Sequence, residues 1–376
     1  MKIRICAICA FGLETLVRFE FERFGLLNIS VSDGRVDADG SMVDIVRLNL
    51  WSRFADRVLI VTGEFTAVTF DGLFEGIRGI PWEEWIDRNG NFPVEGKSVR
   101  STLHHLPSCQ AIVKKAVAER LNHGSGERLP ETGPERRIRF SILKDRVTVA
   151  IDTSGESLHR RGYRLAGGTA PLKETIAAAM VYLSGWQGDI PLLDPCCGSG
   201  TIAVEAAMAA LNIAPGCRRS FAAEKWPVFP SELWRDGRME AREQAKSKEL
   251  CVQASDIDPG AVALAQSNAV RAGVSDSIRF ETKDLNQIWI DREFGTALCN
   301  PPYGERLEGK SAAVHFLHVL GKIFRKKSGW NLLVLTPEDG FERIFGRPAD
   351  RRRKLYNGRI KVDLFQYFGK VPAVSR

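Results

Sequence analysis

In the second half of the chain, short apolar runs alternate with longer segments whose apolar residues recur at helical spacing. The apolar runs are IPLLD (190–194), LCVQASD (250–256), SIRFETKDL (277–285), FGTALC (294–299) and GWNLLVLT (329–336). Strands that alternate with helices predict a parallel, doubly wound sheet. Near the end, Asn357-Gly358 separates two strand-like runs, which is the strongest short-range signal of a β-hairpin. We therefore expect an antiparallel hairpin to close the parallel sheet.

The first half of the chain predicts a mixed α/β organisation. Strand-like and helical patterns alternate over residues 1–60, and residues 61–153 add short strands around one amphipathic helix, CQAIVKKAVAERLNH. Lys144-Asp145 is expected to join the last two of these strands. A segment rich in glycine and charge follows, which is typical of a linker. We divide the chain into an N-terminal unit at 1–62, a second unit at 63–153, a linker at 154–168 and a catalytic unit at 169–376.

The composition is that of a globular protein. The chain has 376 residues, of which 44% are hydrophobic and 26% charged, and this excludes a wholly disordered or fibrous chain. No apolar run approaches the ~18 residues that a membrane span needs, so we expect no membrane partner. The eight cysteines, several of them within apolar runs, are typical of the reducing cytoplasm. Because Cys6 and Cys9 form a CxxC with no second pair, we expect no bound metal.

The net charge of +7 is distributed unevenly along the chain. Residues 1–96 carry 10 Lys and Arg against 15 Asp and Glu, whereas residues 97–164 carry 14 against 7 and residues 343–376 carry 10 against 2. Clustered arginines can pair with phosphates, which favours a nucleic-acid partner, although a single cluster is more often a solvated face. The candidate RNA-binding residues are Arg136, Arg137, Arg139, Arg160, Arg161, Arg351 and Arg352.

The segment DPCCGSGT (194–201) lies between a predicted strand and a predicted helix. Its glycines let the backbone approach a ligand closely, and the helix N-terminus offers free N–H groups. Asp194 would repel a pyrophosphate and attract a cationic amino group, so the loop favours S-adenosylmethionine over a nicotinamide dinucleotide. We expect Asp194, Gly198, Gly200 and Thr201 to bind this cofactor.

Further acids follow the next two predicted strands. Asp256, in ASDIDP, is a candidate partner of the ribose hydroxyls, and Asp284, in TKDL, is a candidate partner of the adenine amine. Each aspartate can instead cap the helix that follows it. We predict the cap for Asp258, which precedes a proline, and the cofactor contact for Asp256.

Asn300-Pro301-Pro302-Tyr303 follows the apolar run TALC. Two prolines stop a strand and stiffen the turn, so the turn would aim the asparagine oxygen and a proline carbonyl oxygen into the cleft at the strand ends. Two convergent acceptors suit an exocyclic amine, whose nitrogen becomes positively charged as it attacks a methyl group. Tyr303 is placed to stack on an extruded base. The alternative is a structural β-turn with a buried tyrosine.

Together, DPCCGSGT, ASDIDP and NPPYGER resemble the motifs of class I S-adenosylmethionine-dependent methyltransferases that modify exocyclic amines. SGESLHRRGYR, APLKET, NIAPG and RRKLYNGR further resemble bacterial 23S rRNA guanine-N2 methyltransferases that carry a THUMP domain. This resemblance implies a ferredoxin-like α+β unit, an RNA-binding THUMP domain and a Rossmann-like catalytic domain, with N2-methylguanosine as the product. It also implies that Asn300, Pro301, Pro302 and Tyr303 form the catalytic turn, and that Pro171 closes over the methionine end of the cofactor.

Three alternatives remain open at this point. Related enzymes that methylate guanine N2 act on tRNA. The same turn also suits the N6 amine of adenine in DNA, although the basic region before the catalytic unit shows no helix-turn-helix signature. A third alternative is a non-catalytic RNA-binding or assembly protein, against which the intact Asp194, Gly198, Gly200 and Asn300 argue. The sequence is silent on oligomeric state.

Overall fold

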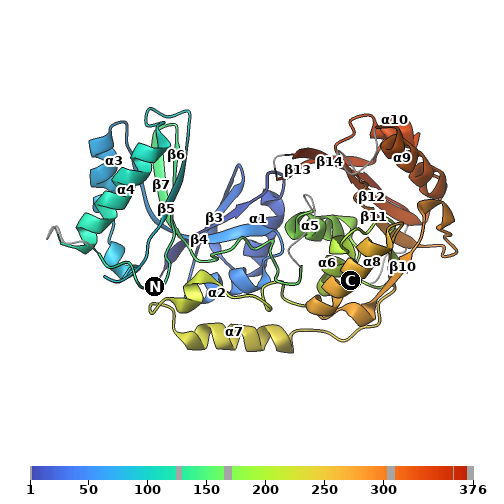
Figure 1. Ribbon diagram of the computed structural model, residues 1–376, viewed down its shortest axis with the longest axis horizontal. Helices are drawn as coiled ribbons and strands as arrows, with labels where there is room; N and C mark the ends of the chain where they lie inside the picture. Colours follow the sequence, from blue (N-terminus) through green and yellow to red (C-terminus); the bar gives the residue numbers. More distant parts are fainter. Residues whose placement is uncertain (1, 124–128, 165–171, 303–309, 359, 371–376) are drawn as a thin grey trace. The chain divides into compact units, whose positions relative to one another are not determined.

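The computed structural model describes residues 2–123, 129–164, 172–302, 310–358 and 360–370. Contacts between residues divide the chain into two compact units (Figure 1). The first unit comprises residues 1–9, 17–158 and 220–239, and the second comprises residues 10–16, 159–219 and 240–376. Residues 10–16 therefore belong to the second unit although they lie in the predicted N-terminal domain, and residues 220–239 belong to the first unit although they lie in the predicted catalytic domain. No helix among the described residues is long and apolar enough to cross a bilayer.

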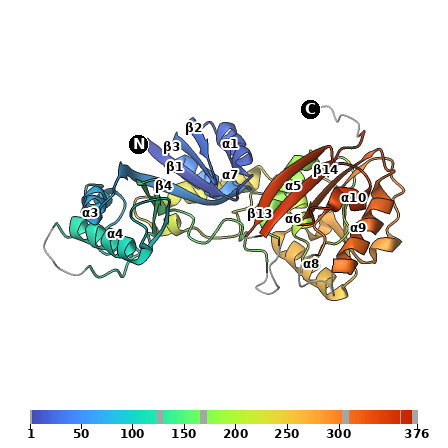
Figure 2. The same ribbon diagram turned by 90° about the horizontal axis from the view of Figure 1, so that it is seen from above.

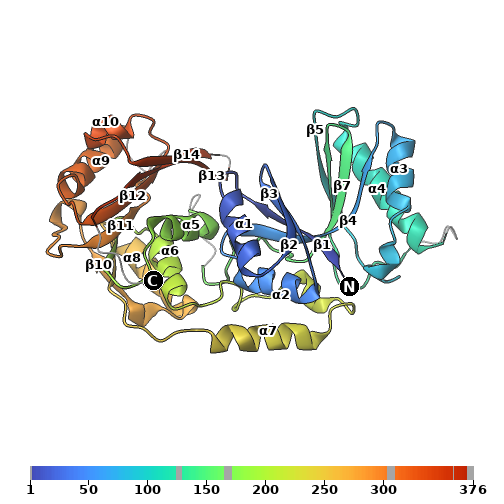
Figure 3. The ribbon, with the colours of Figure 1, turned by 180° about the vertical axis from the view of Figure 1, so that it is seen from behind.

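The first unit is built on a seven-stranded sheet in the order β2-β3-β1-β4-β7-β6-β5. Its strands are β1 (Ile3–Cys9), β2 (Leu27–Ser32), β3 (Arg35–Gly40), β4 (Ala55–Thr66), β5 (Val94–Val99), β6 (Ile138–Leu143) and β7 (Arg146–Asp152). The helices of this part of the chain are α1 (Glu14–Arg23), α2 (Met42–Trp51), α3 (Phe70–Arg78) and α4 (Leu106–Leu121). Helices α3 and α4 lie side by side next to the strands β5 and β7 (Figure 3).

Strand β4 connects the two halves of this sheet. Its first part pairs with β1 and its second part pairs with β7, both antiparallel. The boundary that we predicted between residues 62 and 63 therefore falls inside one strand. Strands β6 and β7 are joined by Lys144 and Asp145, whose φ angles of 50° and 63° form the tight turn expected there.

The second unit carries another seven-stranded sheet, in the order β10-β9-β8-β11-β12-β14-β13. Its strands are β8 (Leu192–Asp194), β9 (Val252–Asp256), β10 (Ile278–Thr282), β11 (Gly295–Cys299), β12 (Trp330–Thr336), β13 (Arg351–Asn357) and β14 (Ile360–Tyr367). The helices in this half of the chain are α5 (Glu174–Ser184), α6 (Thr201–Ala210), α7 (Ser231–Glu243), α8 (Pro259–Ala272), α9 (Lys310–Phe324) and α10 (Phe341–Phe345). Helices α5, α6 and α8 lie on one face of the sheet, and α9 and α10 lie on the other (Figure 2).

This sheet confirms the predicted Rossmann-like fold. Strands β10, β9, β8, β11 and β12 run parallel, and the hairpin β13–β14 adds two antiparallel strands. The central strand β8 lies between β9 and β11, so the order of strands reverses there. In open α/β sheets, ligands bind at such a point, outside the carboxyl ends of the strands. Asp194, Asp256 and Cys299 are the last residues of these three strands.

Candidate active site

The loop between β8 and α6 is held by its neighbours in one conformation. Cys197 donates its backbone N–H to the carbonyl of Ser255 (2.9 Å), and the side-chain amide of Asn268 donates to the carbonyl of Ser199 (3.0 Å). Gly200 caps α6 with a φ of +76°, and a Cβ at this position would lie 2.8 Å from the Cβ of Ala265. Glycine is required here both for the left-handed backbone and for the close approach of α8.

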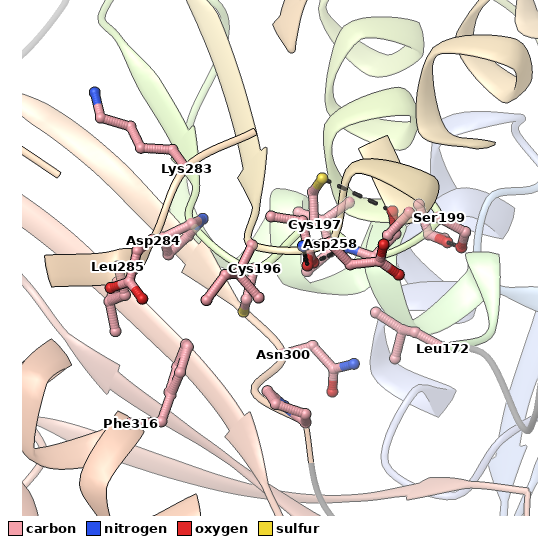
Figure 4. Close-up of a pocket in the computed structure, with 18 of the residues that line it drawn as sticks. Leu172, Cys196, Cys197, Ser199, Asp258, Lys283, Asp284, Leu285, Asn300 and Phe316 are labelled. Atoms are coloured by element: carbon pink, nitrogen blue, oxygen red, sulfur yellow. Dashed lines mark hydrogen bonds between the residues drawn. The ribbon is translucent and has the colours of Figure 1, made fainter. Parts of the chain in front are cut away.

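A cavity of about 740 Å³ lies at the carboxyl ends of the strands (Figure 4). The predicted site residues on its wall are Gly198, Thr201, Asp256, Asp284, Asn300 and Pro302. Gly198 has a φ of +51°, and no atom of a described residue lies within 4 Å of the place where a Cβ would stand, so a ligand can approach this part of the backbone. Pro171 and Tyr303 lie outside the described residues.

Asp256 joins the cofactor loop to the end of β9. Its carboxylate accepts the backbone N–H of Gly198 (2.9 Å) and that of Asp258 (3.1 Å) while also lining the cavity. Asp258 accepts the N–H of Gly260 (2.8 Å) and caps α8, which confirms the cap predicted for it. The ribose contact of Asp256 stays a prediction.

Asp284 caps a helix, which was the alternative to its predicted contact with the adenine amine. Its carboxylate accepts the backbone N–H of Asn286 (2.7 Å) at the start of a short 3₁₀ helix, Leu285–Gln287. The same side chain lies on the cavity wall beside Lys283 (Figure 4). Capping and a cofactor contact are compatible, because a carboxylate has lone pairs for several donors.

Asp194 lies beneath the cavity, whose wall is formed there by the next residue, Pro195. The Asp194 side chain is fully buried, and neither of its oxygens makes a hydrogen bond of good geometry with a described residue. Burial raises the pKa of Asp194 to about 8, and the nearby carboxylate of Asp256 contributes in the same direction. Asp194 is therefore mostly protonated at neutral pH in the absence of a cationic ligand. Its contact with the amino group of the cofactor stays a prediction.

Asp194 should make the stability of the protein depend on pH. An unfolded chain releases this proton near pH 3.8, whereas the folded chain holds it until about pH 8. The contribution of Asp194 to stability is therefore complete at low pH and declines as the pH rises through this interval. We expect Asp194→Asn, which keeps the shape and cannot titrate, to gain stability relative to the original protein as the pH rises. Thermal unfolding of both proteins at several pH values measures this difference, and parallel curves would contradict the raised pKa.

Asn300 is placed by the end of β11. Its side-chain oxygen is buried and has no hydrogen-bonding partner among the described residues, and the side chain lies on the cavity wall (Figure 4). The preceding Cys299 contacts the cofactor loop, because its sulfur lies 3.1 Å from the sulfur of Cys196. This contact with Cys299 and burial raise the pKa of the Cys196 thiol well above its usual range. The loop and the Asn300 turn are thus packed directly against each other.

Arg164 is a cavity residue that the sequence did not single out as part of the site. It donates to the hydroxyl oxygen of Thr201 and to the carbonyl of Leu172, and it lies 3.5 Å from the carboxylate of Glu174. These contacts fix the chain before α5 against the first residue of α6. In the sequence, Arg164 belongs to an arginine cluster, and a charge count cannot distinguish a cavity residue from a surface residue.

Two arginines predicted to bind RNA are buried, and this corrects the prediction. Arg136 is 1% exposed and pairs with Asp87 at 2.8 Å, and Arg161 is 2% exposed and pairs with Glu205 at 3.4 Å. A buried guanidinium already paired with a carboxylate is not presented to a phosphate. Each of these guanidinium groups is instead held by a carboxylate of its own unit.

The other predicted RNA-binding arginines lie nearer to the surface. Arg137 and Arg139 are partly buried and form ion pairs with Glu95, and Arg139 also pairs with Asp152. Arg160, Arg351 and Arg352 are exposed, and Arg352 pairs with Asp363 at 2.7 Å. The RNA contacts of these five arginines stay predictions.

Family models match three consecutive parts of the chain. Residues 4–59 match the RlmL ferredoxin-like domain, residues 67–152 match the THUMP domain, and residues 161–366 match the RMKL-like methyltransferase domain. The ferredoxin-like, THUMP and methyltransferase domains expected from the sequence are therefore confirmed.

Similar proteins cover nearly the whole chain. YpsC of Bacillus subtilis strain 168, assigned as an RNA methyltransferase, is 44% identical over 98% of this chain and 97% of its own length. The ribosomal RNA large subunit methyltransferase K/L of Psychromonas ingrahamii is 35% identical over 97% of this chain, which spans 50% of that protein. The crystal structure of SMU.472, assigned as a methyltransferase and complexed with S-adenosylhomocysteine, is 42% identical, covers 99% of both chains and superposes with a TM-score of 0.93.

The cavity fits the cofactor of these proteins, because it combines an open glycine backbone at Gly198 with the carboxylates of Asp256 and Asp284. The expected cofactor, S-adenosylmethionine, is confirmed by the family. The chain therefore belongs to the RMKL-like methyltransferase family and is an S-adenosylmethionine-dependent RNA methyltransferase with ferredoxin-like and THUMP domains.

Proposed function

We propose that the protein methylates the exocyclic N2 amine of a guanosine in 23S ribosomal RNA. The observation that carries this proposal is the buried side-chain oxygen of Asn300 on the cavity wall, which has no hydrogen-bonding partner among the described residues. A buried acceptor without a donor costs free energy unless a ligand supplies that donor, and an amine hydrogen is such a donor. The ribosomal substrate is supported by the Psychromonas ingrahamii relative, whose name refers to the large ribosomal subunit.

The bound cofactor would supply an electrophilic methyl group: the nitrogen–carbon bond forms as the methyl–sulfur bond breaks, S-adenosylhomocysteine leaves and the nitrogen loses one proton. The protein positions the amine that accepts the methyl group. The lone pair of the guanine amine is delocalised into the ring, so the amine is a weak nucleophile. An N–H donated to the Asn300 oxygen turns the nitrogen towards the cavity and stabilises the positive charge that develops on it. Asp256 accepts the N–H of Gly198 and so fixes the glycine loop. The Asp256 carboxylate and this loop would together hold the cofactor beside the Asn300 turn.

The match of residues 67–152 to the THUMP domain favours RNA over DNA as the substrate, because we expect a THUMP domain to bind RNA. Ribosomal RNA and tRNA both contain guanosines with free N2 amines, so tRNA is the second candidate substrate.

We place the enzyme in the cytoplasm, where its proposed substrate is assembled and where its eight free cysteines would stay reduced.

The substrate class is tested by nucleoside analysis of cellular RNA. Ribosomal RNA and tRNA are purified separately from cells with and without this protein, digested and examined by mass spectrometry. We expect one N2-methylguanosine to disappear from 23S rRNA when the protein is absent. Its loss from tRNA instead would assign the tRNA alternative, and unchanged nucleosides in both fractions would contradict the proposed function.

A further inference from the structure

A tryptophan in the segment after Asp284 is exposed to solvent in the folded protein. Trp289 is 85% exposed, although its neighbours Ile288 and Ile290 pack against the core of the second unit. Exposure of an indole forgoes the stabilisation that its burial would give. Trp289 is thus displayed between two anchored residues.

Two hydrogen bonds fix the backbone on the C-terminal side of this tryptophan. The ammonium of Lys327 donates to the carbonyl of Ile290 (3.0 Å), and the indole of Trp330 donates to the carbonyl of Arg292 (3.1 Å). We call residues 288–292 the strap. Because the strap is tied to β12 and the chain before it, the position of Trp289 is prepared before any ligand binds.

A second cavity, of about 280 Å³, lies against the strap. Trp289 lines it together with Gln253 and Ser255 of β9 and Arg279 of β10. Ser255 is 4% exposed, and its hydroxyl has no hydrogen-bonding partner among the described residues. An amide, an unpartnered hydroxyl and an indole face are the groups that recognise the edge and the face of a nucleobase.

Three cationic and two acidic side chains line this cavity, and one of the cations also lines the first cavity. Arg279, Lys283 and Arg292 line it, together with the carboxylates of Glu281 and Asp291. Glu281 lies 2.7 Å from Arg279 and 3.5 Å from Lys283. Lys283 lines the cofactor cavity as well, so the two cavities adjoin at this side chain.

We propose that the second cavity binds the base of an unpaired RNA nucleotide, which stacks on the indole of Trp289. Single-stranded RNA is held by aromatic side chains that stack on bases and by cations that contact the backbone, and the strap supplies both. The base would belong to the strand whose target nucleotide enters the cofactor cavity. The proposal rests on RNA as the substrate and does not depend on which base atom is methylated.

The test uses the full chain saturated with S-adenosylhomocysteine and a short single-stranded RNA of mixed sequence. We expect Trp289→Ala to weaken RNA binding roughly tenfold, the usual size of the loss when one stacking aromatic is removed. Trp289→Phe should restore most of the affinity, and the affinity for S-adenosylhomocysteine should be unchanged in both variants. The matched control is Tyr182→Ala, because Tyr182 is 44% exposed on α5 and lines neither cavity.

Three results would overturn the proposal. The first is an unchanged RNA affinity of Trp289→Ala, and the second is an equal loss in Tyr182→Ala. The third is a guanosine monophosphate that competes as strongly as the RNA, because the cavity would then serve a free nucleotide. A failure of the N2-methylguanosine assignment leaves these binding results unaffected, so the two failures are distinguishable.

Discussion

Replacement of Asn300 by alanine should lower the turnover number by a factor of about 10²–10³. The affinity for S-adenosylmethionine should stay within about twofold of its original value. This is the pattern found when one transition-state hydrogen bond is removed. The reason is positional. The Asn300 oxygen is an acceptor on the cavity wall with no partner in the described part of the chain, whereas the glycine loop is held by Asp256 and Asn268. Single-turnover kinetics and calorimetry measure the two quantities separately.

Asn300→Asp provides the conservative comparison, because aspartate keeps an oxygen at the same place. We expect it to retain more activity than Asn300→Ala. An equal loss of cofactor affinity and turnover in Asn300→Ala would show that Asn300 only maintains the fold of the cavity, which would remove its proposed contact with the amine.

Replacement of Gly200 by alanine should weaken cofactor binding at least about tenfold. An alanine in the left-handed region costs about 1–2 kcal/mol. The new Cβ would also lie 2.8 Å from the Cβ and 3.2 Å from the Cα of Ala265, so the loop or α8 must move. A displacement of this loop shifts Gly198 and Thr201, which line the cavity, and small displacements of binding groups have large effects.

Gly185→Ala is the matched control for backbone strain. Gly185 has a φ of +72°, close to the +76° of Gly200, but within the described ranges no atom lies within 4 Å of its Cβ position and Gly185 does not line the cofactor cavity. Both variants should lose thermal stability, and only Gly200→Ala should lose cofactor affinity in a calorimetric titration. Equal cofactor affinities of the two variants would show that the contact with Ala265 does not position the loop.

Local signals were sufficient to predict the catalytic fold. Asn357-Gly358 predicts a hairpin, and β13 and β14 pair as expected. Asn357 itself is the last residue of β13 and pairs with Ile360, whereas Gly358 follows it with a positive φ of 67°. The glycine loop and the Asn300 turn were found because each follows an apolar strand, and parallel strands bring their carboxyl ends to one edge of a sheet. The prediction for Asp258 succeeded for a similar local reason, since an aspartate before proline fits the first turn of a helix.

Features that depend on distant partners were not predicted. Arg136 is paired with Asp87 and Arg161 with Glu205, and the sequence separation of each pair hides the contact from a count of local charge. Residues 220–239 pack with the first unit although they lie between two parts of the second. The protonated state of Asp194 depends on its burial and on Asp256, which only the folded chain brings together.

The atom that accepts the methyl group can be identified directly. The purified protein is incubated with RNA from cells that lack it and with S-adenosylmethionine carrying an isotopically labelled methyl group, and the RNA is then digested and its nucleosides are examined by mass spectrometry. We predict that the label is found in N2-methylguanosine from 23S rRNA and that Asn300→Ala reduces this incorporation strongly. Label in N6-methyladenosine or in a ribose-methylated nucleoside, or the absence of labelled nucleosides, would contradict transfer to guanine N2.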